Sequence, residues 1–191
     1  PTTHWANNTK WSFGQHYALL GIVGMVEATH DPTHKSWLMK GWDSNETHMW
    51  DDNPLLYGYF SQADADWSDP RGKGFTPTAD GVTTNVLAMY LAAGEQAGRQ
   101  RMYQLGRNMH DRFITSSDPL VQFGFAEEYE TDWSVDEFST FGFVGHILKT
   151  AWCLARAHLV TNRRGLNWVN RAGDYILDVW NNGGYDHENG G

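Results

Sequence analysis

The segment best suited to chemistry runs Gly145-His146-Ile147-Leu148-Lys149, near the start of a predicted helix. On a helical period of 3.6 residues, Lys149 shares a face with His146. Gly145 has no side chain, so a ligand can approach the backbone closely there. Histidine changes charge near neutral pH and is a natural general acid or base for moving a proton at carbon. We therefore predict His146 as a catalytic acid/base, the alternative being a buried histidine bonded to a backbone carbonyl.

Carboxylates between Glu127 and Asp132 form a second candidate site. Paired carboxylates several ångströms apart are the apparatus of glycoside hydrolysis. If this segment is extended, Glu128, Glu130 and Asp132 face one way and Glu127 faces the other. The alternative is a solvated acidic surface, and the recurrence of Asp132 as Asp66 argues equally for a structural role such as capping a helix. The substrate-binding residues predicted from this stretch are Glu128, Asp132 and Trp133.

No histidine pair predicts a metal site. His30 and His34 have the bare i, i+4 spacing, but no carboxylate accompanies them in the arrangement of a zinc-binding helix. We expect no structural or catalytic metal and no redox cofactor. Cys153 is the only cysteine, which excludes an intramolecular disulfide and favours a reducing compartment, so we expect a cytoplasmic protein.

The elements that must position these residues are helices, because apolar residues recur at three and four positions in six segments. The segments occur in pairs, and Asp31-Pro32 supplies a start signal for the second helix of the first pair. These patterns predict helical hairpins at about 11–50, 80–116 and 142–182.

A related non-helical segment follows each hairpin. The first runs from Gly58 to Asp66-Trp67, and the second runs from Gly124 to Asp132-Trp133 with the same spacing. A third begins at Gly183-Gly184-Tyr185. The repeating unit is therefore a helical hairpin followed by a glycine-aromatic excursion.

A repeat of this length cannot bury its own apolar face, so neighbouring units must stack side by side. We predict an all-α fold, an (α/α)6 toroid of which about three hairpins are present, with a solenoid as the alternative. Residues 1–191 would form one incomplete domain, because six hairpins need about twice this chain. We expect a large exposed apolar surface on the first and last helices.

The composition favours a neutral ligand. The formal charge is -9, from 23 acidic and 14 basic residues, which argues against nucleic acid or an anionic membrane surface as the partner. No apolar run reaches the roughly 18 to 20 residues of a membrane-spanning helix. Ten tryptophans are either core residues or platforms for the C–H face of a sugar.

The order of the motifs resembles that of the N-acylglucosamine 2-epimerase and cellobiose 2-epimerase superfamily. The motifs are the K-x-x-F-x-Q pattern that ends at Gln15, the Gly-aromatic excursions that end in Asp-Trp, and the Gly145-His146 segment followed by Trp152-Cys153-Leu154-Ala155-Arg156-Ala157. Members of this superfamily are α/α barrels that act on reducing sugars.

The resemblance implies that His146 acts on the proton at C2 of an open-chain sugar to give an enediolate-like intermediate. Reprotonation at C2 gives the epimer, whereas reprotonation at C1 interconverts aldose and ketose. A second histidine on the opposite face is expected beyond Gly191, and Trp152 is expected in or behind the pocket wall.

Two positions depart from the family pattern. The glutamate of its G-H-x-x-E motif is Lys149 here, a cation that cannot accept the same hydrogen bond and disfavours a protonated His146 beside it. The histidines of its N-T-H-L-H segment are absent from residues 81–85, where Asn85 could bind a hydroxyl but could not transfer a proton. The further substrate-binding residues predicted are Gln15, Asn85, Lys149 and Trp152.

We therefore predict a sugar epimerase or aldose-ketose isomerase that acts on a reducing mono- or disaccharide by proton transfer at C2. One alternative is a glycoside hydrolase on the same barrel, using carboxylates; another is a member that binds carbohydrate or protein without catalysis. The expected partner is a small sugar, with no nucleic acid or membrane, and a homodimer is left open.

Overall fold

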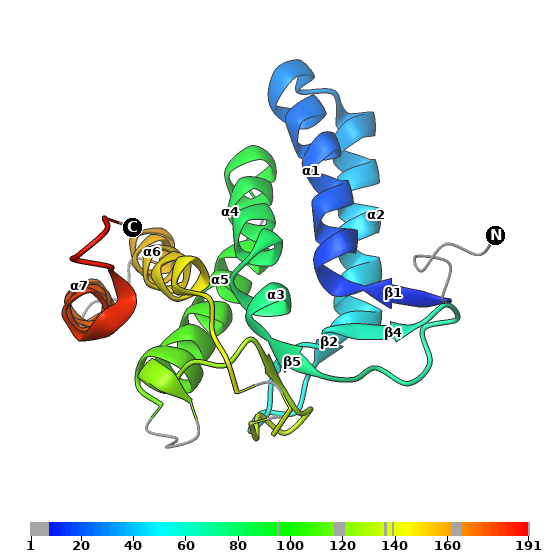
Figure 1. Cartoon of the computed structure of the whole chain (residues 1–191). Coiled ribbons are helices and arrows are strands. Elements are labelled where there is room, and N and C mark those ends of the chain that lie inside the picture. The colour runs from blue at the N-terminus through cyan, green and yellow to red at the C-terminus, as the bar shows by residue number, and fades with distance from the viewer. Residues whose placement is uncertain are drawn as a thin grey trace.

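A computed structural model describes residues 8–94, 96–116, 121–135, 137–138, 140–161 and 166–190. In this part of the chain, six helices of at least 12 residues form three hairpins (Figure 1). The hairpins are α1 (Ser12–Thr29) with α2 (Pro32–Met49), α4 (Gly81–Ala93) with α5 (Gln96–Asn108), and α6 (Val144–Thr161) with α7 (Trp168–Val179). Shorter helical turns are α3 (Phe75–Thr78), η2 (Met109–Ile114), η3 (Gln122–Gly124) and η4 (Trp180–Gly184).

Local signals in the sequence account for the turn of the first hairpin. His30 adopts a left-handed conformation (φ 53°) after the last residue of α1, and its N–H bonds to the carbonyl of Val26. Asp31 then caps α2, accepting a 2.7 Å hydrogen bond from the N–H of Thr33, with Pro32 at the first helical position. The chain reverses within two residues, so α1 and α2 lie antiparallel.

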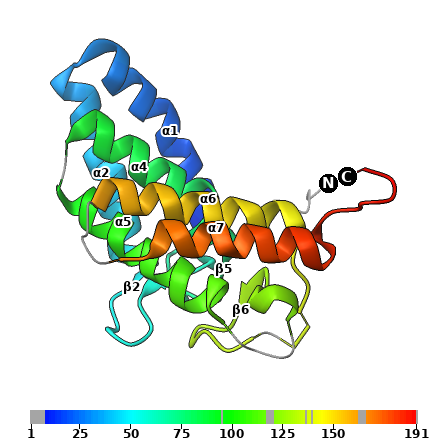
Figure 2. The same cartoon turned by 90° about the vertical axis from the view of Figure 1, so that its left-hand side faces the viewer.

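The hairpins are arranged in succession, as Figures 1 and 2 show from two sides. Helix α1 packs against α2 and α4, α5 packs against α4 and α6, and α7 packs against α6. At the approach of α5 to α7, a Cβ on Gly106 would lie 2.4 Å from Cζ3 of Trp168, so any side chain at this position would displace the indole ring. The predicted fold class, three hairpins of an α/α toroid, is confirmed.

Short strands connect the hairpins at one end of the helices. Strand β1 precedes α1 and pairs antiparallel with β4, and β5 precedes α3 and pairs antiparallel with β6 in the same way. A further strand pair, β2–β3, closes the loop after α2. The strands are β1 (Thr9–Trp11), β2 (Trp50–Asp51), β3 (Gly58–Tyr59), β4 (Gln62–Asp64), β5 (Lys73–Gly74) and β6 (Glu128–Tyr129).

The repeated Asp-Trp pairs form the same tight turn twice. Asp66 accepts hydrogen bonds from the backbone N–H (3.0 Å) and hydroxyl (2.6 Å) of Ser68, and Asp132 does the same with Ser134 (2.9 and 2.6 Å). Trp67 and Trp133 both have positive φ, 70° and 69°. These aspartates therefore hold a turn, and neither caps a following helix.

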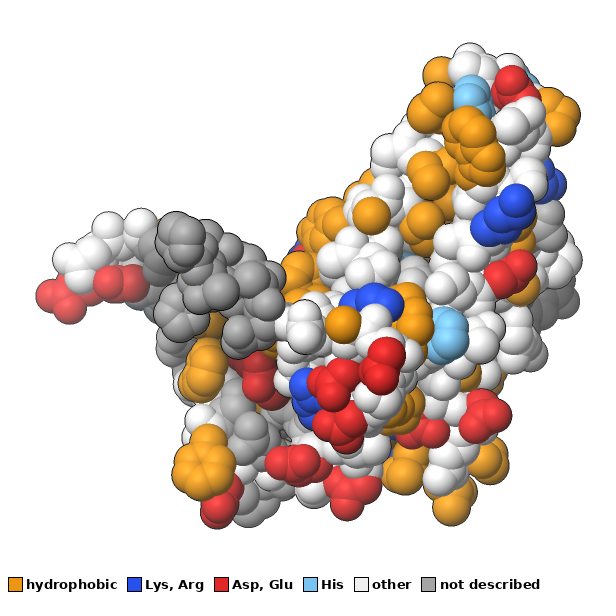
Figure 3. Space-filling model, turned by 90° about the vertical axis from the view of Figure 1, so that its right-hand side faces the viewer, with side chains coloured by type: hydrophobic (Ala, Val, Ile, Leu, Met, Phe, Trp, Pro, Cys, Tyr) orange, Lys and Arg blue, Asp and Glu red, His pale blue; other side chains and the backbone are white. Residues whose placement is uncertain are grey.

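Large apolar side chains remain exposed on the first and last helices. The accessible surface is 10319 Å², against roughly 9,200 Å² expected for a compact monomer of this mass. On α1 they include Tyr17 and Met25, and on α7 they include Ile176 and Leu177. Figure 3 shows hydrophobic side chains gathered over the α1–α2 hairpin.

Of the helices described, none combines the length and apolar character that crossing a membrane requires.

Candidate functional site

His146 lies in the first turn of α6, where its imidazole is held from two sides. Its ring stacks on Phe75, with ring centroids 4.0 Å apart and planes 12° from parallel. Its Nδ1 lies 2.8 Å from Oε2 of Glu127. The histidine side chain is 38% exposed, whereas that of Glu127 is only 9% exposed. A half-open imidazole is thus anchored by a buried carboxylate.

Glu127 is itself fixed through both its side chain and its backbone. Oε1 accepts a 2.8 Å hydrogen bond from the N–H of Phe143, just before α6. The Glu127 carbonyl accepts a 3.0 Å hydrogen bond from the N–H of Phe75, at the start of α3. Gly74 permits this close approach, because a Cβ there would lie 2.3 Å from the Glu127 carbonyl oxygen. Two segments distant in the chain, one at Gly74 and Phe75 and the other at Phe143, therefore position Glu127.

This arrangement selects a tautomer for His146. A carboxylate only accepts hydrogen bonds, so the Nδ1 of His146 carries the hydrogen directed at Glu127. The Nε2 atom is then left with a lone pair, and it makes no hydrogen bond within the described residues. A neutral imidazole with a fixed Nδ1–H and an available Nε2 is the form that accepts a proton from a substrate.

A charged cluster lies one helical turn further along α6. The ammonium of Lys149 forms an ion pair with Asp80, which precedes α4. The hydroxyl of Tyr17 on α1 lies 3.5 Å from the same carboxylate oxygen. Burial by itself lowers the pKa of Lys149, but the hydrogen bond and charge of Asp80 outweigh it and leave that pKa raised. The first helices of all three hairpins therefore meet at this cluster, beside His146.

Trp152 lies one further turn along α6 and is 47% exposed. The guanidinium of Arg156 lies over its ring, 5.1 Å from the centroid. His146, Lys149 and Trp152 thus follow one another on the partly open side of α6.

Asn85 lies elsewhere, inside the contact between α1 and α4. It has no exposed surface, and its amide nitrogen lies 3.1 Å from Nδ1 of His16. Its amide therefore serves the packing of these helices, and a sugar could reach it only if that packing changed. Gln15, the preceding residue in α1, is half-buried.

The acidic segment separates into inward and outward residues. Glu127 and Tyr129 are buried, whereas Glu128 and Glu130 are exposed, as expected for an extended stretch. Glu128 lines a separate pocket of about 220 Å³ together with Arg71, so it is not grouped with His146.

The two predicted residues at the end of this segment, Asp132 and Trp133, are part of the tight turn that Ser134 closes. The hydrogen bonds from Ser134 lower the pKa of Asp132. Trp133 is 6% exposed and its indole N–H donates a 2.8 Å hydrogen bond to the carbonyl of Leu56. Its ring packs in the core, so Trp133 is not grouped with His146.

Sequence reasoning missed the partners of His146. The alternation of the acidic segment indicated that Glu127 faces away from its neighbours, and this was the available signal. Nothing in the sequence connected Phe75, Asp80 or Tyr17 to the site.

Within the described ranges, no three His, Cys, Asp or Glu side chains are grouped as a metal ion requires.

Comparison with known proteins gives a family and a fold. The N-acylglucosamine 2-epimerase family matches residues 2–191. No curated protein matched the chain by sequence. Three similar solved structures are a D-mannose isomerase (TM-score 0.77, 20% identity), a cellobiose 2-epimerase from Bacillus thermoamylovorans B4167 (0.75, 11%) and a sugar epimerase from a ruminal bacterium (0.69, 14%).

These likenesses extend over 97%, 92% and 92% of this chain, respectively, and over 46%, 46% and 45% of the other chains. The chain therefore spans slightly less than half the length of the structures it matches. At such low identity, the likeness establishes the shared fold.

Proposed function

The chain belongs to the N-acylglucosamine 2-epimerase family, and from this premise we propose that it is part of a sugar epimerase or aldose-ketose isomerase in which His146 transfers the proton. The substrate would be a reducing mono- or disaccharide in its open-chain form. The observation that carries the proposal is the His146–Glu127 pair, with Nδ1 held at 2.8 Å and Nε2 available.

In this reaction, Nε2 of His146 takes the proton from C2 of the aldose. The electrons of the broken C–H bond form the C1–C2 double bond, and the carbonyl oxygen takes up the negative charge. Glu127 stabilises the resulting imidazolium through the hydrogen on Nδ1, as a carboxylate does in other histidine acid/base pairs. The proton then returns from Nε2 to carbon.

Lys149 is the cation best placed to stabilise the developing oxyanion. It lies one turn from His146, and its ammonium is 6.0 Å from the centroid of the Phe75 ring on which the imidazole stacks. Asp80 balances the charge of Lys149, but the ammonium has three N–H donors and would direct one of them at the developing oxyanion, which lowers the barrier without reorganisation. Trp152 and Tyr17 would border the sugar on the same side of the helices.

One acid/base can carry the carbon-bound proton of an aldose-ketose interconversion, because that proton leaves C2 and returns to C1 on one face of the enediolate. The proton of the O2 hydroxyl passes to O1 as the carbonyl moves from C1 to C2. Inversion at C2 needs a second acid/base on the opposite face. The products of the reaction therefore distinguish an isomerase from an epimerase.

The test is isotope exchange in D2O. The protein is incubated with reducing sugars, including mannose, glucose, fructose and cellobiose, and deuterium at C1 and C2 is followed by NMR. We expect exchange with at least one sugar and a loss of about 10²- to 10⁴-fold in His146→Ala. His158→Ala on the same helix is the matched control, with an unchanged rate.

Glu127→Gln tests the positioning role. We expect a lower exchange rate and a changed pH profile, because an amide no longer stabilises the imidazolium. Exchange that persists in His146→Ala would refute the assignment. Release of reducing ends from a glycoside without exchange would favour the hydrolase alternative, and neither activity would favour a binding role.

A further inference from the structure

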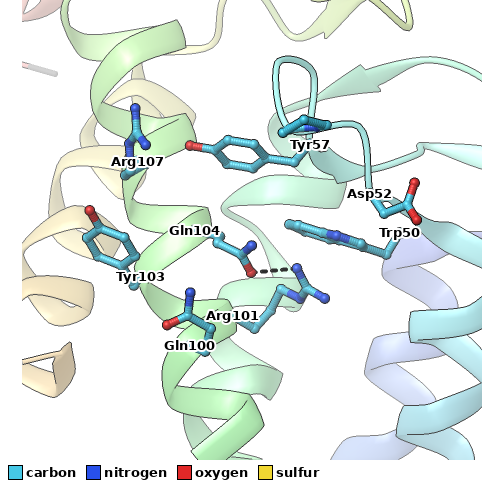
Figure 4. Close-up of a pocket in the computed structure, with 9 residues that line it drawn as sticks. Trp50, Asp52, Tyr57, Gln100, Arg101, Tyr103, Gln104 and Arg107 are labelled. Atoms are coloured by element: carbon cyan, nitrogen blue, oxygen red, sulfur yellow. Dashed lines mark hydrogen bonds between the residues drawn. The ribbon is translucent and has the colours of Figure 1, made fainter.

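A second pocket, of about 600 Å³, lies beside α5, away from His146. One wall comes from β2 and the loop that follows it, and the other comes from successive turns of α5 (Figure 4). The volume is within the range of small-molecule sites. The lining residues are Trp50, Asp52, Pro54, Tyr57, Gln100, Arg101, Tyr103, Gln104 and Arg107.

Contacts within the protein hold the two aromatic side chains of the pocket wall, Trp50 and Tyr57, in place. The rings of Trp50 and Tyr57 are 27° from parallel, with centroids 6.2 Å apart. The guanidinium of Arg101 lies 3.2 Å from the centroid of Trp50. Arg101 is in turn fixed by an ion pair with Glu46 and a 2.6 Å hydrogen bond to Oε1 of Gln104. Figure 4 shows this bond, with both aromatic rings facing α5.

The opposite wall presents amides. Gln100 and Gln104 are four residues apart on α5, so their side chains lie on one face of the helix. An amide side chain both donates and accepts hydrogen bonds, which suits a hydroxyl group. Because Oε1 of Gln104 accepts from Arg101, its NH₂ group is the end left to donate. The carboxylate of Asp52 adds an acceptor at the rim.

The charges of the pocket do not favour an anion. Arg101 pairs with Glu46, and Arg107 lies 3.3 Å from a carboxylate oxygen of Asp111. Asp52 brings a further negative charge to the lining. Both guanidinium groups are thus balanced within the protein, and a phosphate would meet no uncompensated cation among these residues.

We propose that this pocket is a binding site for a neutral saccharide, distinct from the site at His146. The C–H groups of a pyranose would contact the Tyr57 ring and the part of the Trp50 indole that Arg101 leaves open, and its hydroxyls would bond to Gln100, Gln104 and Asp52. The inference does not depend on the proposed catalytic function, because no residue of the pocket belongs to the His146 site.

The experiment follows the Trp50 indole N–H by proton–nitrogen NMR, with its signal assigned through Trp50→Phe. The probes are methyl β-cellobioside, methyl β-maltoside and methyl α-mannopyranoside, which cannot open to a reducing sugar. Inorganic phosphate and ADP are the anionic comparisons. We expect a saturable shift with at least one glycoside and none with the anions.

Two variants locate the binding. Gln100→Ala should weaken it about 2- to 10-fold, the equivalent of one hydrogen bond, and Tyr57→Ala should weaken it about tenfold through the lost ring contact. Gln96→Ala, exposed on the same helix, is the matched control with unchanged affinity. His146→Ala should leave the Trp50 shift intact.

Several results would overturn the proposal. These are the absence of a saturable shift with all three glycosides, a shift produced by phosphate or ADP instead, unchanged affinity in both pocket variants, or loss of the Trp50 shift in His146→Ala. Because Gln100 is exposed and makes no hydrogen bond within the described residues, its substitution tests binding without disturbing the fold.

Discussion

A fall in pH from 7 to 5 should destabilise the protein through one buried histidine, His16. This residue has no exposed surface and lies between α1 and α4, where the amide nitrogen of Asn85 lies 3.1 Å from its Nδ1. The ring of Tyr59 covers it edge-on, with centroids 4.8 Å apart. Burial, and secondly the positive charge of Arg101, lower the pKa of His16 from 6.5 to about 3.

The sign of the effect follows from proton binding. His16 is neutral in the folded protein down to about pH 3, whereas in the unfolded chain it binds a proton below its ordinary pKa of 6.5. Above pH 6.5 the histidine is neutral in both states, so its burial carries no protonation penalty. As the pH falls from 6.5 towards 3, only the unfolded chain binds the proton, and the free energy of unfolding decreases. With these two pKa values, linkage gives a loss of about 2 kcal/mol between pH 7 and pH 5.

The assay is urea unfolding of the wild type and His16→Gln at pH 7, 6 and 5. Other groups also titrate in this range, so the informative quantity is the difference in unfolding free energy between the two proteins. We expect that difference to change by about 2 kcal/mol in favour of the variant as the pH falls. Ser12→Ala, also buried in α1, is the non-titrating control and should show a constant difference.

A difference between wild type and His16→Gln that does not vary with pH would refute this reasoning. It would mean that His16 takes up a proton equally in the folded and unfolded states. The burial of the imidazole between α1 and α4 would then be wrong.

Three further predictions follow from packing and charge. Gly106→Ala should lower the unfolding free energy by about 1–3 kcal/mol, because its Cβ would lie 2.4 Å from the Trp168 ring, whereas Gly21→Ala, with open space around it, should not. Cys153 is buried and burial raises its pKa to about 12, so a thiol reagent at pH 8 should leave it unmodified until the protein unfolds; rapid native reaction would contradict this. A double-mutant cycle of Lys149→Met and Asp80→Asn should give a coupling of about 1 kcal/mol or less, since the pair is partly exposed; a larger coupling would indicate a more desolvated pair.

The helices and their repetition could be predicted from the sequence because their signals are local. Apolar spacing identified the hairpins, and Asp31-Pro32 identified the start of α2, where the structure places a cap. The recurrence of Asp66-Trp67 as Asp132-Trp133 identified the excursions. Its role as a turn could not be predicted, because the bonds to Ser68 and Ser134 depend on a backbone conformation that the side chains alone do not specify.

The composition of the site was decided by tertiary structure. His146 was predicted from its motif, but its carboxylate partner Glu127 is 19 residues away, and the partner of Lys149, Asp80, is 69 residues away. Asn85 has a polar side chain that could bind a sugar hydroxyl, but where α1 packs on α4 its amide lies against His16. Periodicity determines which residues share a helix face; which faces meet depends on how the hairpins stack, and that decides which polar groups remain open to a substrate.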